Sequence, residues 1–185
     1  MEPKNAETLS SEYIEQHQYF NATKNAYRLA SGKIVDPYFV VELPSSACVL
    51  GITKDKKCIL VKQYRYPVNE ILYELPGGFM EPNEFPELAI LREMEEETGH
   101  VFKEAIGLGF TYANPGVLNN KTHLFLAMDG MLEKTPSLDM NEEISIELVD
   151  LNKLKQMLKD GEFLQSMHAL CIYRALEKLG ELSIK

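Results

Sequence analysis

Short runs of apolar residues, each bounded by turn-forming residues, dominate the pattern along this chain. Residues 27–30 and 34–41 flank a Ser31-Gly32 turn, which predicts a β-hairpin near the N-terminus. Residues 47–52 and 58–64 are more continuously apolar and flank a charged turn, which predicts a second hairpin with buried strands. The first part of the chain is therefore expected to consist of antiparallel strands.

The rest of the chain mixes the two-residue period of strands with the longer period of amphipathic helices. Four further strands are expected, at residues 71–75, 106–112, 122–128 and 144–149. Helices are expected at residues 85–98, 151–158 and 165–179. This order of elements predicts an α+β protein.

Composition limits the classes of protein that this pattern can build. The chain has 185 residues, 45% of them hydrophobic, and a net charge of −9, as in a soluble protein with a sizeable core. The acidic balance argues against nucleic acid as a partner, because that affinity comes from clustered Lys and Arg. No run approaches the roughly 20 apolar residues of a membrane span, and no apolar leader is evident, so we expect no membrane partner and a cytoplasmic location.

The three cysteines are Cys48, Cys58 and Cys171. They are widely separated and have no CxxC spacing, so they suggest neither disulfides nor a zinc site. We expect buried free thiols, with a reactive thiol as the alternative.

Three glutamates gather where the first predicted helix ends. Glu93, Glu96 and Glu97 share one helical face, because residues three and four apart are neighbours there, and Gly99 is expected to end the helix. Mutual repulsion and the negative end of the helix dipole both oppose such a cluster. Crowded carboxylates are ligands that Mg²⁺, Mn²⁺ and Ca²⁺ require, so the pattern indicates a metal site, with a solvated charged face as the alternative.

The residues around these acids have a defined order and spacing. The order is Gly78, five residues, Glu84, seven residues, Arg92-Glu93, Met94, one residue, Glu96-Glu97, one residue and Gly99. This order resembles the Nudix box, the signature of hydrolases that cleave nucleoside diphosphates linked to another moiety. His100 departs from the family pattern, which has a bulky apolar residue there, and this change concerns packing rather than ligands.

The resemblance implies a metal site. Glu93, Glu96 and Glu97 match the metal-binding acids of the family, and the Gly77 carbonyl is a further expected ligand. The implied cofactor is Mg²⁺, with Mn²⁺ as a possible substitute, and Glu96 and Glu97 are expected to be catalytic through it.

Other box residues match supporting roles. Arg92 and Glu84 match positions that pair within the box and would orient the carboxylates, so Arg92 is placed with the catalytic residues. The alternative for this pair is an ordinary surface ion pair. Ala89, Ile90 and Met94 face the other way and are expected to pack on a sheet.

The resemblance also implies the architecture and the assembly. A Nudix fold has a mixed central β-sheet sandwiched between α-helices, here with an N-terminal β-hairpin extension. We expect residues 47–185 to form the Nudix hydrolase domain and residues 1–46 to form a strand extension that takes part in a dimer interface. Related enzymes are commonly dimers of this kind, so a homodimer is expected.

The segments 61–67 and 73–78 are similar to those of the branch that acts on nucleoside diphosphate sugars, especially ADP-ribose pyrophosphatases. Arg65 matches an arginine that contacts substrate, and a planar guanidinium suits phosphate. Glu74 matches a position that lines the substrate site. Tyr64 is either a stacking partner for the base or ribose or a core tyrosine with a wet hydroxyl. Pro115 is another mark of the branch, although a Pro-Gly turn alone explains it.

The resemblance to the ADP-ribose pyrophosphatase branch weakens at the position five residues after Pro115. Many ADP-ribose hydrolases have a glutamate there that assists catalysis, whereas this chain has Asn120, which cannot usefully accept a proton. We therefore expect the base at Glu143 or Glu142, just before a strand, in preference to a box glutamate. Asn120 is kept as a substrate contact, or as a turn former.

The expected activity is metal-dependent hydrolysis of a pyrophosphate linkage, with ADP-ribose giving AMP and ribose 5-phosphate. Two alternatives stay open. One is a GDP-mannose or broad-range nucleoside diphosphate sugar hydrolase, which the missing glutamate favours. The other is a catalytically silent Nudix domain that senses nucleotides, which the complete set of box acids disfavours.

Overall fold

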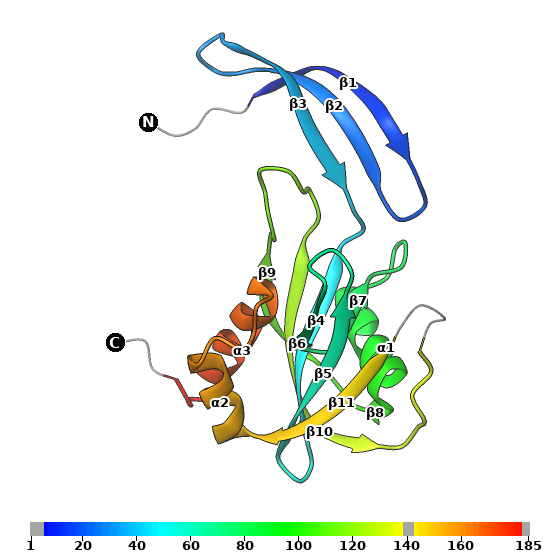
Figure 1. The fold of residues 1–185 in the computed structure, drawn as a ribbon, viewed down its shortest axis with the longest axis vertical. Helices are drawn as coiled ribbons and strands as arrows, with labels where there is room; N and C mark the ends of the chain where they lie inside the picture. The colour runs from blue at the N-terminus through cyan, green and yellow to red at the C-terminus, as the bar shows by residue number, and fades with distance from the viewer. Residues whose placement is uncertain (1–5, 139–142, 183–185) are drawn as a thin grey trace. The chain divides into compact units, whose positions relative to one another are not determined.

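A computed structural model describes residues 6–138 and 143–182 of the chain (Figure 1). Its elements are β1 (Glu7–Gln16), β2 (Asn21–Arg28), β3 (Ile34–Glu42), β4 (Ser46–Thr53), β5 (Lys57–Arg65), β6 (Glu70–Glu74), β7 (Gly77–Phe79), α1 (Pro86–Thr98), β8 (His100–Val101), β9 (Ile106–Thr111), β10 (Thr122–Leu132), β11 (Ile144–Asp150), α2 (Leu151–Lys159) and α3 (Ser166–Lys178). No helix in these two described stretches is long and apolar enough to cross a membrane.

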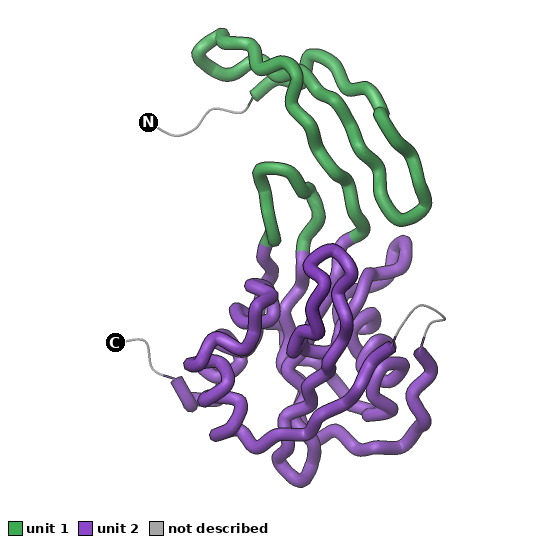
Figure 2. The backbone as a smooth tube through the Cα atoms, viewed as in Figure 1, with its two compact units in different colours: residues 1–44, 112–121 green, residues 45–111, 122–185 purple. Residues whose placement is uncertain are grey.

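The chain forms two compact units (Figure 2). The first contains the chain up to Pro44 together with residues 112–121, and the second contains residues 45–111 and the chain from Thr122 onward. The division at residues 46 and 47 that the sequence suggests stays a prediction of domain organisation.

The first unit is built on a three-stranded antiparallel sheet in the order β1-β2-β3. The hairpin predicted around Ser31-Gly32 is confirmed as β2 and β3, and the Leu29 N–H closes it by donating to the Lys33 carbonyl. β1 is an addition that the sequence pattern did not predict, because all ten of its residues are exposed and carry no buried stripe. The loop at 112–121 joins this unit through a hydrogen bond from the Val41 N–H to the Val117 carbonyl, 2.8 Å long.

The second unit contains an eight-stranded sheet with the central order β11-β5-β4-β10-β8. β6 pairs with β5, β7 with β4 and β9 with β10. β4 and β10 run parallel to each other, and the other pairs are antiparallel. The predicted mixed sheet is therefore confirmed.

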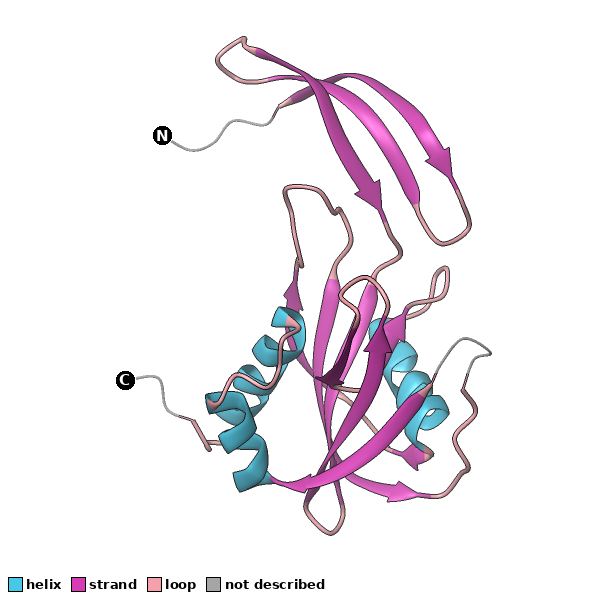
Figure 3. Cartoon of the chain, in the orientation of Figure 1, coloured by secondary structure: helices cyan, strands magenta, loops and turns pink. Residues whose placement is uncertain are grey.

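Side chains of the central strands alternate between two apolar layers, as the pleat requires. Ala47 and Val49 of β4 face the layer that contains Ile90 and Met94 of α1. Even-numbered residues of β4 face the opposite layer, which contains residues of α2 and α3. The sheet therefore lies between α1 on one face and α2 and α3 on the other (Figure 3).

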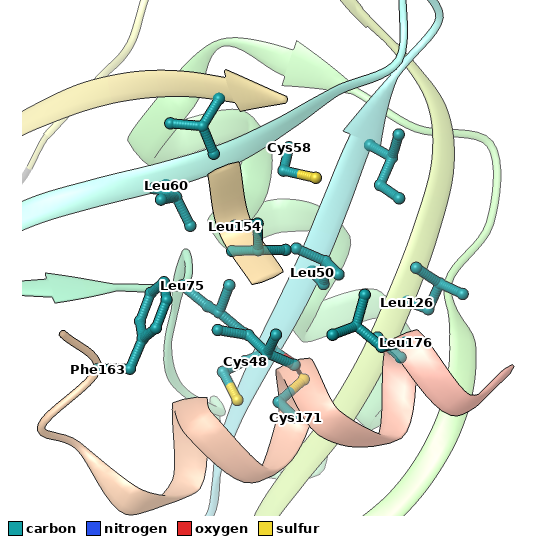
Figure 4. Close-up of a cluster of buried hydrophobic side chains, with 14 of the residues drawn as sticks. Cys48, Leu50, Cys58, Leu60, Leu75, Leu126, Leu154, Phe163, Cys171 and Leu176 are labelled. Atoms are coloured by element: carbon teal, nitrogen blue, oxygen red, sulfur yellow. Dashed lines mark hydrogen bonds between the residues drawn. The ribbon is translucent and has the colours of Figure 1, made fainter. Parts of the chain in front are cut away.

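The larger layer, between the sheet and α2 and α3, holds all three cysteines (Figure 4). Cys48, Cys58 and Cys171 are buried free thiols, as predicted. Burial raises the pKa of Cys58 to about 12, which leaves its thiol protonated and unreactive at neutral pH.

Candidate active site

The helix that carries the acids is positioned by its apolar face and by the residues at its ends. Ala89, Ile90 and Met94 are each 1% exposed and pack against the sheet, as predicted. Pro86 occupies the first turn, where its missing N–H costs nothing. Gly99 ends the helix in the left-handed conformation at φ 71°. The remaining face presents the acidic residues.

Arg92 holds three of these carboxylates at once. Its Nε and Nη2 donate to the two carboxylate oxygens of Glu84, both at 3.0 Å, which confirms the predicted pair. Its Nη1 donates to Glu93 Oε1 at 2.9 Å and to Glu96 Oε2 at 2.8 Å. Hydrogen bonding to Glu84 raises the pKa of Arg92, and the guanidinium lowers the pKa of Glu84, so both groups stay charged at neutral pH.

The Gly77–Gly78 backbone approaches the same acids from β7. The Gly77 N–H donates to Oε2 of the buried Glu97 at 2.9 Å. Gly77 has φ +150°, and a Cβ there would lie 2.1 Å from the Ala47 carbonyl oxygen. A Cβ on Gly78 would lie 2.7 Å from the Glu93 carboxylate. Only glycine therefore lets this backbone lie directly against Glu93 and Glu97.

The composition of this site suits a divalent cation. Four carboxylates, from Glu84, Glu93, Glu96 and Glu97, surround one guanidinium, so four negative charges less one positive charge leave a local excess of three. Their oxygens are the hard donors that Mg²⁺ and Mn²⁺ prefer. Across the described ranges, however, no group of three or more His, Cys, Asp or Glu side chains is arranged so that it could hold a metal ion. The metal-binding roles stay predictions that the donor type, the charge excess and the glycine contact support.

Arg65 and Glu74 form a second pair, on the strands that lead to Gly77. Arg65 Nε and Nη2 donate to the two Glu74 carboxylate oxygens at 2.8 and 2.5 Å. The Glu74 side chain is 1% exposed, whereas that of Arg65 is 38% exposed. Glu74 therefore faces the guanidinium rather than open space, and Arg65 is the member of the pair that reaches the surface. Tyr64 donates from its hydroxyl to Asn69 Oδ1 and is partly exposed.

His168 is a residue that the sequence did not place at the site. It lies in the first turn of α3, and its Nδ1 accepts a hydrogen bond from the Leu75 N–H at 3.1 Å. The same nitrogen lies 3.9 Å from Glu74 Oε2. Burial lowers the pKa of His168 to about 4, so the ring is neutral at pH 7. Its partner is 93 residues away along the chain, so no local pattern could have revealed the contact.

The other four predicted site residues are Pro115, Asn120, Glu142 and Glu143. Pro115 and Asn120 belong to the first unit, where Pro115 lines a groove of about 660 Å³. The Asn120 amide is buried and donates to the Pro44 carbonyl at 3.2 Å. Glu143 is exposed directly before β11, and Glu142 lies outside the described residues. The predicted roles of these four residues stay predictions.

Substitution of Gly78 by Ala tests the contact between the backbone and Glu93. The new Cβ would displace the Glu93 carboxylate, so we expect Mn²⁺ binding, measured by electron paramagnetic resonance, to weaken by about ten-fold or more. Gly107→Ala is the matched control, because a Cβ there meets only a Phe125 ring carbon, at 3.9 Å. Unchanged Mn²⁺ affinity in Gly78→Ala would contradict the assignment.

The buried His168 predicts a dependence of stability on pH. Its folded-state pKa of about 4 lies below the ordinary value of 6.5, so the unfolded state binds more protons between these values and stability falls as pH drops from 6.5 to 4. We expect the stability advantage of the wild type over His168→Asn to shrink by about 2 kcal/mol between pH 7 and pH 5. Urea unfolding at both pH values measures it, and a constant difference would show that the histidine is not buried in its neutral form.

Comparison with known proteins agrees with this geometry. The family profile described as NUDIX domain matches residues 42–170. ADP-ribose pyrophosphatase of Bacillus subtilis is 31% identical over 160 residues, which cover 78% of this chain and 86% of that protein. GDP-mannose pyrophosphatase of Klebsiella pneumoniae is 28% identical, over 78% of this chain and 76% of its own. A solved structure described as ADP compounds hydrolase matches with a TM-score of 0.80 at 18% identity, covering 98% of this chain and 100% of the other, and shows the same fold. Because the family profile spans most of the chain, including the whole acidic helix and Gly77–Gly78, this protein belongs to the Nudix family.

Proposed function

We propose that this protein hydrolyses the pyrophosphate linkage of a nucleoside diphosphate sugar, with ADP-ribose as the substrate and AMP and ribose 5-phosphate as the products. The observation that carries the proposal is the contact of the Gly77–Gly78 backbone with Glu93 and Glu97, beside the Arg92 pairs. Similarity to the Bacillus subtilis ADP-ribose pyrophosphatase over most of both chains supports the substrate class.

The box residues would hold Mg²⁺, or Mn²⁺, through Glu93, Glu96, Glu97 and the Gly77 carbonyl. Such ions lower the pKa of bound water and neutralise charge on phosphoryl oxygens. Arg92 keeps Glu93 and Glu96 in fixed orientations by bonding to both. The excess of negative charge left by one guanidinium among four carboxylates favours cation binding.

Arg65 is proposed to bind the diphosphate of the substrate. Its guanidinium is partly exposed, and its plane is fixed by two hydrogen bonds to the buried Glu74. A fixed guanidinium loses little conformational freedom when it binds phosphate. Glu74 then contributes by orienting Arg65, and Tyr64, Pro115 and Asn120 are retained as proposed substrate contacts.

Glu143 is proposed to accept the proton of the attacking water, with Glu142 as the alternative. Glu143 directly precedes Ile144, which pairs with Gln63 of β5, two residues before Arg65. This register supports a location of Glu143 at the end of the sheet that carries Arg65. The water oxygen attacks one phosphorus, and the bond from that phosphorus to the bridging oxygen breaks to release the two phosphate products.

A GDP-mannose or broad-range sugar hydrolase is the second candidate. It is favoured by Asn120, where a catalytic glutamate was expected, and by the similarity to GDP-mannose pyrophosphatase. Product analysis with ADP-ribose, GDP-mannose and UDP-glucose separates the two. A catalytically silent nucleotide sensor would bind one of these compounds without hydrolysing it. The complete set of box acids in this chain disfavours that function.

The protein is also proposed to form a homodimer through the first unit. Its sheet exposes large apolar side chains on both outer strands, Tyr13 and Ile14 on β1 and Ile34 and Phe39 on β3. A three-stranded sheet with so much exposed apolar surface gains stability when a partner covers it. A cytoplasmic location, expected from the sequence, stays a prediction.

The double substitution Glu96→Gln with Glu97→Gln tests the metal-dependent activity. Loss of two proposed ligands is expected to lower kcat/KM for ADP-ribose at saturating Mg²⁺ by more than about a hundred-fold. The fold should survive, because repulsion in the cluster is relieved. AMP release measures turnover and thermal unfolding measures stability. Retained turnover in a folded double variant would rule out the metal assignment.

The proposed base is tested by Glu142→Gln combined with Glu143→Gln. We expect kcat to fall by about 10²-fold to 10⁴-fold and the acidic limb of the pH profile to disappear, because the group that must be ionised is gone. Glu177→Gln, on the exposed surface of α3, is the control. A pH profile identical to that of the wild type would move the base to a box glutamate.

A further inference from the structure

The segment between β6 and β7 is left out of both neighbouring strand ladders. The β6 pairing with β5 ends at Glu74, opposite Val61, and the β7 pairing with β4 begins at Gly77, opposite Cys48. Leu75 lies between them and is 1% exposed. Its N–H therefore has no strand partner in the pairings of the described residues, and a buried N–H without a partner is costly.

His168 supplies the missing acceptor. The Leu75 N–H donates to His168 Nδ1 at 3.1 Å, from the first turn of α3. The ring is almost fully buried, and only a neutral imidazole has an Nδ1 that can accept. α3 is thereby connected to the segment that leads into the Nudix box.

The same segment is held at every residue up to the box. Glu74 is bonded to Arg65, and the Pro76 carbonyl accepts from the Val49 N–H at 3.1 Å. The Gly77 N–H then donates to Glu97 at 2.9 Å. A shift of the Leu75 backbone would therefore move Gly77. The Gly77 backbone lies so close to β4 that a Cβ there would overlap the Ala47 carbonyl, so Gly77 has no space to move in that direction.

We infer that His168 is a positioning residue of the Nudix box, which sets the affinity of the site for a divalent cation by fixing the Leu75 amide and, through it, the Gly77 backbone against Glu97. The inference rests on the proposed function, because it takes Gly77 and Glu97 as metal ligands. It adds a residue from α3, outside the box in sequence, to the metal site. A merely structural histidine would contribute to stability and leave metal affinity unchanged.

Three variants of the 185-residue chain separate these roles. His168→Leu removes the acceptor and keeps an apolar side chain. His168→Asn keeps an acceptor oxygen near the position of Nδ1. Ile172→Ala, one turn further along α3, removes fully buried packing with no polar group involved. Mn²⁺ binding is measured by electron paramagnetic resonance without substrate, and circular dichroism and thermal unfolding report the fold.

We expect His168→Leu to weaken Mn²⁺ binding by about ten-fold or more, the effect typical of losing a group that orients metal ligands. His168→Asn should stay within about three-fold of the wild type, and Ile172→Ala should lower thermal stability without changing Mn²⁺ affinity. If His168→Leu does not fold, His168→Gln takes its place, because its longer side chain moves the acceptor away from the Nδ1 position.

Wild-type affinity in a folded His168→Leu or His168→Gln variant would overturn the inference, as would an equal loss in Ile172→Ala or in His168→Asn. A wild-type protein that binds no Mn²⁺ would overturn the proposed metal site and this inference together. The two failures are therefore distinguishable, since the first leaves wild-type binding intact.

Discussion

The close approach of the Gly77–Gly78 backbone to the carboxylates of α1 is the constraint on which the rest of the second unit depends. Four acids near one guanidinium repel one another, and this arrangement is kept only because the surrounding structure holds it. β7 pairs with β4 through Ala47 and Cys48, which brings the two glycines to the helix. Ile90 and Met94 press the opposite face of α1 onto the sheet. The free energy gained by packing one face of α1 on the sheet thus offsets the repulsion among the carboxylates on its other face.

Two arginines have different electrostatic roles in this arrangement. Arg92 is placed among the acids, where it lowers their mutual repulsion and leaves an excess of negative charge for a cation. Arg65 is held by one buried carboxylate, Glu74, and carries its positive charge to the surface. Arg92 therefore lies where a cation is proposed to bind, and Arg65 lies where an anion is proposed to bind. A metal-dependent pyrophosphate hydrolase must bring these two components together.

The sequence was informative where local pattern and burial coincide. The strands β4, β5 and β10 were predicted because their apolar runs face a core, and the order of the box residues located α1 and its acids. β11 was predicted from its alternation of apolar and polar residues, although Val149 is its one buried residue. β1 was missed because all of its residues are exposed, and β7 and β8 because they are too short to show a period. The replacement of a bulky apolar residue by His100 was interpreted as a change in packing. The His100 ring is buried and lies close to Thr98. The contact of His168 with Leu75 depends on tertiary structure alone. The burial of Glu74 also depends on tertiary structure. Its sequence match indicated only a residue that lines the substrate site.

The central claim is that the acids of α1 and the Gly77 carbonyl together form a divalent cation site. The most direct measurement is anomalous diffraction at the manganese edge from crystals of the protein grown with Mn²⁺ and a non-hydrolysable ADP-ribose analogue. The account predicts anomalous peaks within coordination distance of Glu93, Glu96, Glu97 and the Gly77 oxygen, with the diphosphate beside them. Well-ordered crystals with the analogue bound and no manganese peak at these residues would contradict it.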